Sequence, residues 1–134
     1  MLARKWLIPI LIVVVVIVFS SHGLKGGPEI SVKDMVSLMK GDPRPVIVDL
    51  RSSVEYKLGA IPGALSVPQA DFKTKLDSLK LPKTDAVVLY GAGDTEARAI
   101  TRHLYESGYQ GALTLKGGYD AWLTAGQQVT KTSP

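Results

Sequence analysis

The chain has 134 residues, enough for one compact domain with a short appendage and too few for two ordinary domains. It contains no cysteine, which excludes disulfides, iron–sulfur clusters, thiolate metal sites and any mechanism that uses a thiol of its own. Arg4 and Lys5 supply half of the formal net charge of +4, so the rest of the chain is nearly neutral and is not expected to bind nucleic acid.

The N-terminal segment is strongly apolar. Residues 6–19 carry no charge, and the run extends to Leu24 through weakly polar residues, approaching the ~17–25 residues that span a bilayer. Residues 1–24 therefore form either an uncleaved transmembrane anchor, our first prediction, or a cleaved signal peptide. Because the basic pair Arg4 and Lys5 precedes the run, the N-terminus should be cytoplasmic. Both interpretations export the rest of the chain to the periplasmic or extracytoplasmic side.

A Gly/Pro linker is predicted over residues 25–30, followed by one domain over 31–129 and a C-terminal tail over 130–134. The linker is too short to separate the domain far from a membrane. The bilayer itself is thus a predicted partner of an anchored chain.

The first half of the domain alternates helices with short strands. Ser31 is typical of a residue that caps a helix, and apolar residues recur at helical spacing until Gly41. The apolar run 46–50 predicts a strand that is buried on both faces. A short helix over 54–58 and a brief strand over 64–67 follow it.

The second half continues the alternation. A helix is predicted over 71–79, a second strongly apolar strand over 86–90, and a long helix over 95–107. A final strand over 112–115 and a helix over 119–124 complete the domain. This order predicts an α/β fold, a small doubly wound and mostly parallel sheet with helices on both faces.

Two segments carry a resemblance to a known family. IVDLRSSVEYKLGAIPGALSVP and LTLKGGYDAWLTAGQQV resemble the two signatures of rhodanese-like domains, and the similarity runs over about residues 30–129. The resemblance implies a doubly wound α/β domain and assigns a structural part to the signature residues Asp49, Arg51, Glu55, Gly63, Gly117, Gly118 and Trp122. Asp49 and Arg51 are expected to form an ion pair or loop brace rather than an acid/base pair, and Trp122 to belong to the core.

The resemblance also identifies a departure. In that family the loop after the strand that matches 86–90 holds a nucleophilic cysteine, which accepts a sulfane sulfur as a persulfide and passes it on. Gly91 stands at that position and offers no nucleophile. A basic residue usually follows five places later, where this chain has Glu96, and Asp94 adds a second negative charge. The two carboxylates are expected to repel an anionic donor by on the order of 1 kcal/mol per close pair.

The loop remains the candidate ligand-binding site, formed by Gly91, Ala92, Gly93, Asp94, Thr95 and Glu96. Arg98 and Arg102 either compensate the acidic charge or pair with Glu96 or Glu106 on the helix surface.

Other chemistries find less support in the sequence. Thr95 is interpreted as a helix-start residue rather than a nucleophile, since no histidine is placed near it. Glu96 replaces the third glycine that a dinucleotide-binding loop would need. His103 is expected to be a structural or surface residue, so we predict no catalytic residue, metal or cofactor.

These observations predict a membrane-tethered, exported domain that is not an enzyme. It would act as a protein-interaction or assembly module, for instance an accessory subunit of a membrane complex. The alternative is a protein that binds or carries an anion or sulfur compound, or a sulfurtransferase-related enzyme that works without its own cysteine. In a third interpretation a partner supplies the thiol.

Overall fold

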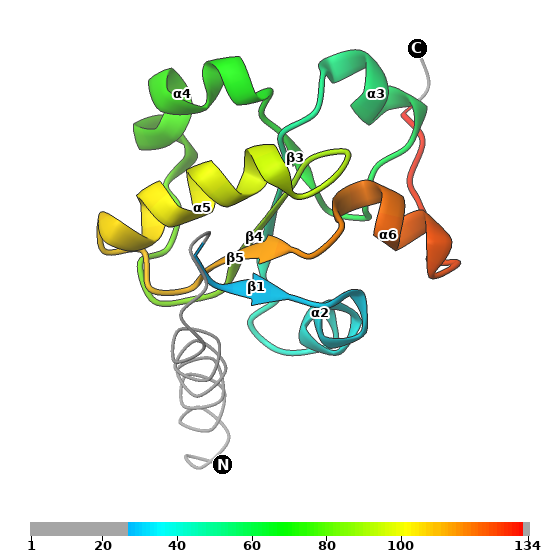
Figure 1. The fold of residues 1–134 in the computed structure, drawn as a ribbon, viewed down its shortest axis with the longest axis horizontal. Coiled ribbons are helices and arrows are strands. Elements are labelled where there is room, and N and C mark those ends of the chain that lie inside the picture. Colours follow the sequence, from blue (N-terminus) through cyan, green and yellow to red (C-terminus); the bar gives the residue numbers. More distant parts are fainter. Residues whose placement is uncertain (1–26, 133–134) are drawn as a thin grey trace.

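The computed structural model describes residues 27–132, which fold around one parallel β-sheet (Figure 1). In chain order the elements are β1 (Glu29–Ile30), α2 (Val32–Met39), β2 (Val46–Asp49), α3 (Ser53–Leu58), β3 (Leu65–Ser66), the 3₁₀ turn η1 (Gln69–Asp71), α4 (Phe72–Leu79), β4 (Val87–Tyr90), α5 (Thr95–Glu106), β5 (Ala112–Leu115) and α6 (Gly118–Thr124). The strand order is β1-β5-β4-β2-β3, and every pairing is parallel. The predicted mostly parallel α/β fold is confirmed.

Helices cover both faces of the sheet. Alternate residues of β4 point to opposite sides, so Val88 and Tyr90 join one core cluster while Val87 and Leu89 join the other. Figure 1 shows α2 and α6 on one side of the sheet and α4 and α5 on the other. This two-sided burial explains why β4 reads as a continuous apolar run in the sequence.

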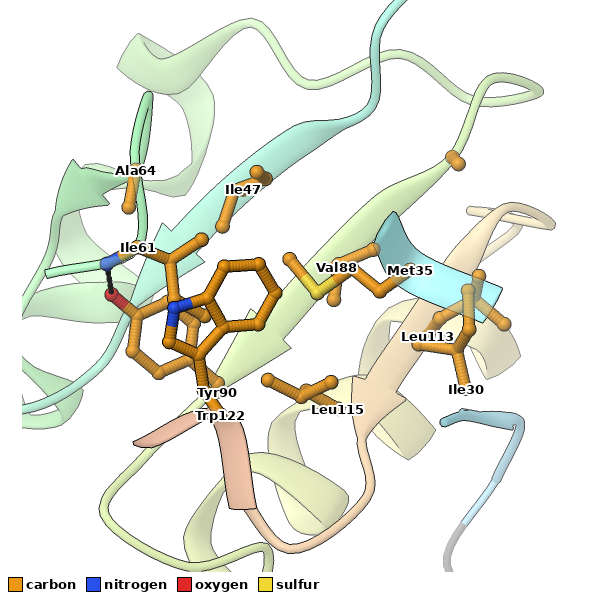
Figure 2. Packing of buried hydrophobic residues seen from close by; sticks show 11 residues of the cluster. Ile30, Met35, Ile47, Ile61, Ala64, Val88, Tyr90, Leu113, Leu115 and Trp122 are labelled. Carbon is orange, nitrogen blue, oxygen red and sulfur yellow. Dashed lines mark hydrogen bonds between the residues drawn. The ribbon is translucent and has the colours of Figure 1, made fainter. Parts of the chain in front are cut away.

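The first core cluster lies between the sheet, α2 and α6. Figure 2 shows Met35 of α2 and Trp122 of α6 over the strand residues Val88 and Leu115. The Trp122 side chain is 2% exposed, and its indole N–H donates to the Gln128 carbonyl oxygen at 2.9 Å. Trp122 is therefore a core residue with its polar atom satisfied.

Side-chain caps begin two of the helices. The Ser31 hydroxyl oxygen accepts the Asp34 N–H at 3.1 Å at the start of α2. The Ser52 hydroxyl oxygen accepts the Glu55 N–H at 3.2 Å, and its O–H donates back to the Glu55 carboxylate at 3.0 Å. Each cap satisfies a backbone N–H that has no partner within the first turn of its helix.

Several element boundaries differ from those predicted from the sequence. Glu29 and Ile30, assigned to the linker, form the edge strand β1 by pairing with Thr114 and Leu115. A two-residue strand has no periodicity to read, and its partner strand supplies the structure. The helix predicted from 71 begins as a 3₁₀ turn, so α4 starts one residue later.

The predicted tail is held in place at its beginning. Thr130 forms an antiparallel bridge with Ala60, and the Thr132 N–H donates to the Lys57 carbonyl oxygen at 3.1 Å. These are contacts between segments far apart in sequence, which local patterns do not reveal.

Within residues 27–132, no helix combines the length and apolar character that crossing a bilayer requires. The predicted anchor over residues 1–24 lies outside the described residues.

Candidate functional site

The candidate loop lies at the edge of the sheet where the strands end. Because all strands are parallel, the segments that follow β2, β4 and β5 leave at this same edge. The candidate loop 91–96 follows β4, which lies in the middle of the sheet, and its last two residues begin α5. Ligand sites of open α/β sheets are typically formed at this edge. We call it the exit edge.

The loop is fastened to the start of α6. The Tyr119 N–H donates to the Gly91 carbonyl oxygen at 2.9 Å, and the Asp120 N–H donates to the Ala92 carbonyl oxygen at 3.0 Å. The loop carbonyls thereby satisfy N–H groups of the first turn of α6. Gly118 makes this approach possible, because a Cβ there would clash with the carbonyl oxygens of Gly93 and Gly91.

Replacing Gly118 by alanine should displace the loop. Gly118 and Gly126 both have positive φ angles, +61° and +71°, but a Cβ at Gly126 meets nothing within 4 Å. Both alanine variants therefore carry the free-energy cost of a positive φ angle. Only Gly118→Ala adds a steric clash. We expect it to be less stable than Gly126→Ala by about 2 kcal/mol or more, measured by urea unfolding. Equal stabilities would show that the loop does not depend on this contact.

The backbone N–H groups of the loop have no hydrogen-bond acceptor among the described residues. Among the described residues, the backbone N–H groups of residues 92–97 make no hydrogen bond, whereas the carbonyls of Gly91 and Ala92 do. N–H groups gathered before and in the first turn of a helix favour a negative charge. The loop thus has the form of an anion cradle.

A carboxylate of the chain faces this cradle. Glu96 Oε2 lies 2.9 Å from the position that a Cβ on Gly91 would take. The Glu96 side chain is exposed and makes no ion pair with any described residue. The space that a side chain at position 91 would enter is consequently bordered by negative charge.

Asp94 is not the unpaired repelling charge that the sequence predicts. Its Oδ2 accepts the Gly117 N–H at 3.1 Å and a guanidinium N–H of Arg98 at 3.2 Å, so the charge is paired within the domain. Arg98 Nε also lies 2.8 Å from Glu29 Oε1, as an ion pair without hydrogen-bond alignment. The expectation of two repelling carboxylates is therefore wrong for Asp94, because the i,i+4 spacing gives it Arg98 as a partner. Of the two loop carboxylates, Glu96 is the one without an ion-pair partner among the described residues.

Each of the two alternatives predicted for the arginines holds for one of them: Arg98 compensates an acidic charge of the loop, and Arg102 forms a pair on the helix surface. Arg102 pairs with Glu106 at 3.0 Å, as predicted. Arg98 pairs with Asp94 and Glu29 instead of with Glu96 or Glu106.

A buried polar network lies beneath the loop. The Arg51 guanidinium donates to Asp49 Oδ2 at 2.8 Å and to the Gly59 carbonyl oxygen at 2.6 Å. The Tyr90 hydroxyl donates to Asp49 Oδ2 at 2.6 Å and accepts the Ile61 N–H at 3.1 Å, the bond drawn in Figure 2. The side chains of Asp49 and Arg51 are 0% and 6% exposed. The pair is thus desolvated and fully hydrogen-bonded at its carboxylate.

Two tyrosines connect this network with the loop. The Arg51 guanidinium carbon lies 3.8 Å from the centre of the Tyr119 ring, and the Tyr90 and Tyr119 rings stack at 6.2 Å. Tyr90 directly precedes Gly91, and Tyr119 binds the Gly91 carbonyl through its own N–H. Arg51 therefore contacts both tyrosines that adjoin Gly91, one before it in the chain and one bound to its carbonyl oxygen.

Burial and Asp49 set the protonation of the network. Burial and the hydrogen bond to Asp49 raise the pKa of the Tyr90 phenol, which stays neutral. For Arg51, burial disfavours the charged form, but the hydrogen bond and charge of Asp49 outweigh it and raise the pKa. The pair is therefore a fixed brace rather than a proton donor and acceptor.

The remaining predicted residues lie in several places. Thr95 is the first residue of α5, and His103 is exposed on the same helix. Glu55 belongs to the cap of α3. Gly63 and Gly117 adopt positive φ angles of +84° and +76°, in turns that favour glycine. Of these residues, Thr95 belongs to the candidate loop 91–96, and the Gly117 N–H donates to Asp94 of that loop.

Sequence reasoning missed Tyr90 and Tyr119. Tyr90 was assigned to an apolar strand, although a phenol at the end of a buried strand requires a hydrogen-bond partner. The acidic end of the neighbouring strand, Asp49, was the signal that could have identified it.

Comparison with curated proteins finds distant relatives. The chain is 30% identical over 87 residues to the tRNA uridine(34) hydroxylase of Erwinia tasmaniensis, covering 62% of this chain and 25% of that protein. It is 29% identical over 96 residues to the enzyme of the same name from Buchnera aphidicola, covering 69% and 30%. The chain thus spans less than a third of the length of these relatives.

This finding corrects the prediction that the chain is not an enzyme, because the relatives are named as hydroxylases. The prediction was drawn from the missing cysteine at position 91. The absence of this cysteine removes one nucleophile. It does not exclude another reaction, or an active site in another part of a larger protein.

Solved structures support the same fold. A crystal structure of the Alr3790 protein from Anabaena matches with a TM-score of 0.68 and 30% identity, covering 77% of this chain and 80% of that one. A rhodanese-like domain protein from Staphylococcus aureus matches with a TM-score of 0.66 at 22% identity, covering 79% and 99%, a likeness of fold alone. The family model of the rhodanese-like domain matches residues 31–125. The chain therefore belongs to the rhodanese-like domain family.

Proposed function

We propose that this chain is a membrane-held rhodanese-like module that binds a protein partner at the loop 91–96. The observation that supports the proposal is the Glu96 carboxylate, which borders the cradle at Gly91 where the chain has no side chain. A loop of this form is fixed by α6 and by the Arg51 network, so it presents a preorganised surface.

The charges of the loop favour a cationic group on the partner. Glu96 is exposed and unpaired among the described residues, and exposed Asp120 adjoins the loop through its N–H bond to Ala92. Asp94 is already neutralised by Arg98. A lysine or arginine of the partner that pairs with Glu96 would gain a charge-assisted hydrogen bond as the loop loses water.

The module is proposed to act as one part of a larger assembly. The curated relatives are hydroxylases in which the matched region is 25% to 30% of the chain, so most of each enzyme lies outside it. By analogy, this domain would supply a docking surface within a larger assembly that carries an enzymatic activity.

The placement at a membrane is inferred from the sequence alone. Residues 1–24 are proposed to be a single-pass anchor with the N-terminus in the cytoplasm and the domain on the extracytoplasmic side. Release of the domain after signal cleavage is the alternative.

A second candidate function rests on the unpaired N–H groups of residues 92–97. These groups favour an anion or a thiolate, so the loop would receive a sulfur compound or a cysteine of the partner. Glu96 opposes this function and favours the first, so a substitution at position 96 separates the two.

Glu96→Gln and Glu96→Arg are the test, with Glu106→Gln at the other end of α5 as the matched control. Membranes carrying the full chain are extracted in mild detergent and sized under native conditions. We expect Glu96→Gln to reduce the complexed fraction about tenfold, Glu96→Arg to abolish it, and the control to leave it unchanged.

Calorimetry with thiosulfate distinguishes the second function. If both Glu96 variants keep the complex but bind thiosulfate more tightly than the wild type, the loop is an anion site and the docking proposal is wrong. Migration of the wild type as a free monomer would also contradict docking.

A further inference from the structure

The edge of the sheet where the strands begin forms a surface of its own. The Val46 N–H donates to the Ala86 carbonyl at 3.0 Å, and the Val87 N–H donates to the Gly111 carbonyl at 2.8 Å, so the starts of β2, β4 and β5 are aligned. Three segments precede these strands: residues 40–45, 80–86 and 107–111. We call this surface the entry edge. It lies opposite the exit edge because the strands are parallel.

The entry edge is basic. Four cations stand on its segments and are exposed: Lys40, Arg44, Lys80 and Lys83. Two acids accompany them, exposed Asp42 and half-buried Asp85. The Lys83 ammonium lies 3.8 Å from the centre of the Tyr109 ring, which fixes one charge on this surface. At the exit edge, in contrast, exposed Glu96 lies in the loop and exposed Asp120 in α6, and the exposed cation Lys116 follows β5.

The chain also enters the domain at this edge. The described residues begin at Gly27, two positions before β1, and Gly27 lies against the backbone of Arg102 in α5. The predicted anchor ends at residue 24, and three residues reach about 10 Å at most. An anchored chain therefore brings Gly27, where the described residues begin, to within about one Debye length of the headgroups.

We propose that the entry edge rests on a bilayer surface of anionic headgroups. This inference depends on the proposed membrane anchor and adds which face of the domain meets the lipid. Lysine and arginine side chains near such a surface are attracted to its negative potential. The exit edge with the loop 91–96 then faces away from the membrane, where a partner can reach it.

The test reconstitutes the full chain into vesicles of phosphatidylcholine alone and of phosphatidylcholine mixed with phosphatidylglycerol. Amide hydrogen exchange is measured for residues 40–45, 80–86 and 107–111, with 91–96 as an internal reference. We expect exchange at the entry edge to slow severalfold in the anionic vesicles only, and high salt to reverse the effect. The reference segment should be unaffected.

Two triple variants, each of which removes three positive charges, distinguish an effect of the entry edge from an effect of the net charge of the domain. Lys40→Gln/Arg44→Gln/Lys80→Gln removes three cations from the entry edge. Lys33→Gln/Lys57→Gln/Lys116→Gln removes three that lie on α2, on α3 and after β5. The first variant should lose the lipid-dependent protection, and the second should keep it.

The outcomes distinguish the inference from the function on which it depends. Equal exchange in both vesicle types, or an equal loss in both variants, overturns the docking of the entry edge and leaves the anchor standing. A wild-type chain that fails to float with either vesicle overturns the anchor as well.

Discussion

Replacing Asp49 by alanine should lower the free energy of unfolding by about 3–5 kcal/mol. Asp49 Oδ2 accepts hydrogen bonds from both Arg51 and Tyr90, at 2.8 and 2.6 Å, and its side chain is fully buried. Alanine leaves a desolvated guanidinium and a buried phenol without their acceptor. Urea unfolding of the full chain in mild detergent, followed by circular dichroism, measures the change.

Two further variants show whether charge or hydrogen bonding is lost. Asp49→Asn keeps an acceptor and should fall between the wild type and alanine. Glu106→Ala breaks an exposed pair with Arg102 and should cost less than about 1 kcal/mol. If Asp49→Ala costs no more than Glu106→Ala, the network does not brace the fold.

Introducing a cysteine at the loop should restore sulfur transfer only when Glu96 is also replaced. A side chain at Gly91 would place its Cβ 2.9 Å from Glu96 Oε2, so the carboxylate would crowd the thiol and raise its pKa. The Gly91→Cys variant alone should therefore transfer sulfur only slowly. We expect Gly91→Cys/Glu96→Arg to transfer sulfur from thiosulfate to cyanide at least about tenfold faster, since a cation nearby stabilises the thiolate by on the order of 1 kcal/mol or more.

The pH dependence of alkylation by iodoacetamide reports the thiol pKa in both variants. The pKa should be lower in the double variant by about one unit or more. Gly91→Cys/Glu106→Gln serves as the control and should behave as the single variant does. Equal rates and equal pKa values in the single and double variants would refute the electrostatic account of the loop.

The sequence predicts the central part of the fold well. The apolar runs at 46–50 and 86–90 are β2 and β4, because strands buried on both faces need apolar residues at every position. The short strand β1 has no such signal. Its two residues become a strand through β5, a partner more than eighty positions away.

The site is predicted less completely than the fold. The motif around Asp49 and Arg51 indicates an ion pair, and the pair is present. Sequence alone does not show that Tyr90 and Tyr119 join it, since those contacts cross from one element to another. Nor does it show that Asp94 is neutralised while Glu96 is not. Both carboxylates stand near one arginine in sequence, and only the geometry of α5 decides between them.

The two proposed functions, contact with the lipid surface and binding of a protein partner, are assigned to opposite edges of the sheet. The basic entry edge lies where the chain enters the domain, and the acidic loop lies at the exit edge. A domain oriented in this way would hold its loop away from the lipid. Substitutions at one edge should therefore leave the other function intact, and the triple variants and the Glu96 variants provide that comparison.

Photocrosslinking in intact membranes tests the central proposal most directly. p-Benzoylphenylalanine is placed at exposed Ala92 in the loop and, as a control, at exposed Asp77 on α4. Docking at the loop predicts one discrete adduct with another protein from position 92, its loss when Glu96→Arg is added, and no such adduct from position 77. An adduct that survives Glu96→Arg, or none from position 92, would contradict it.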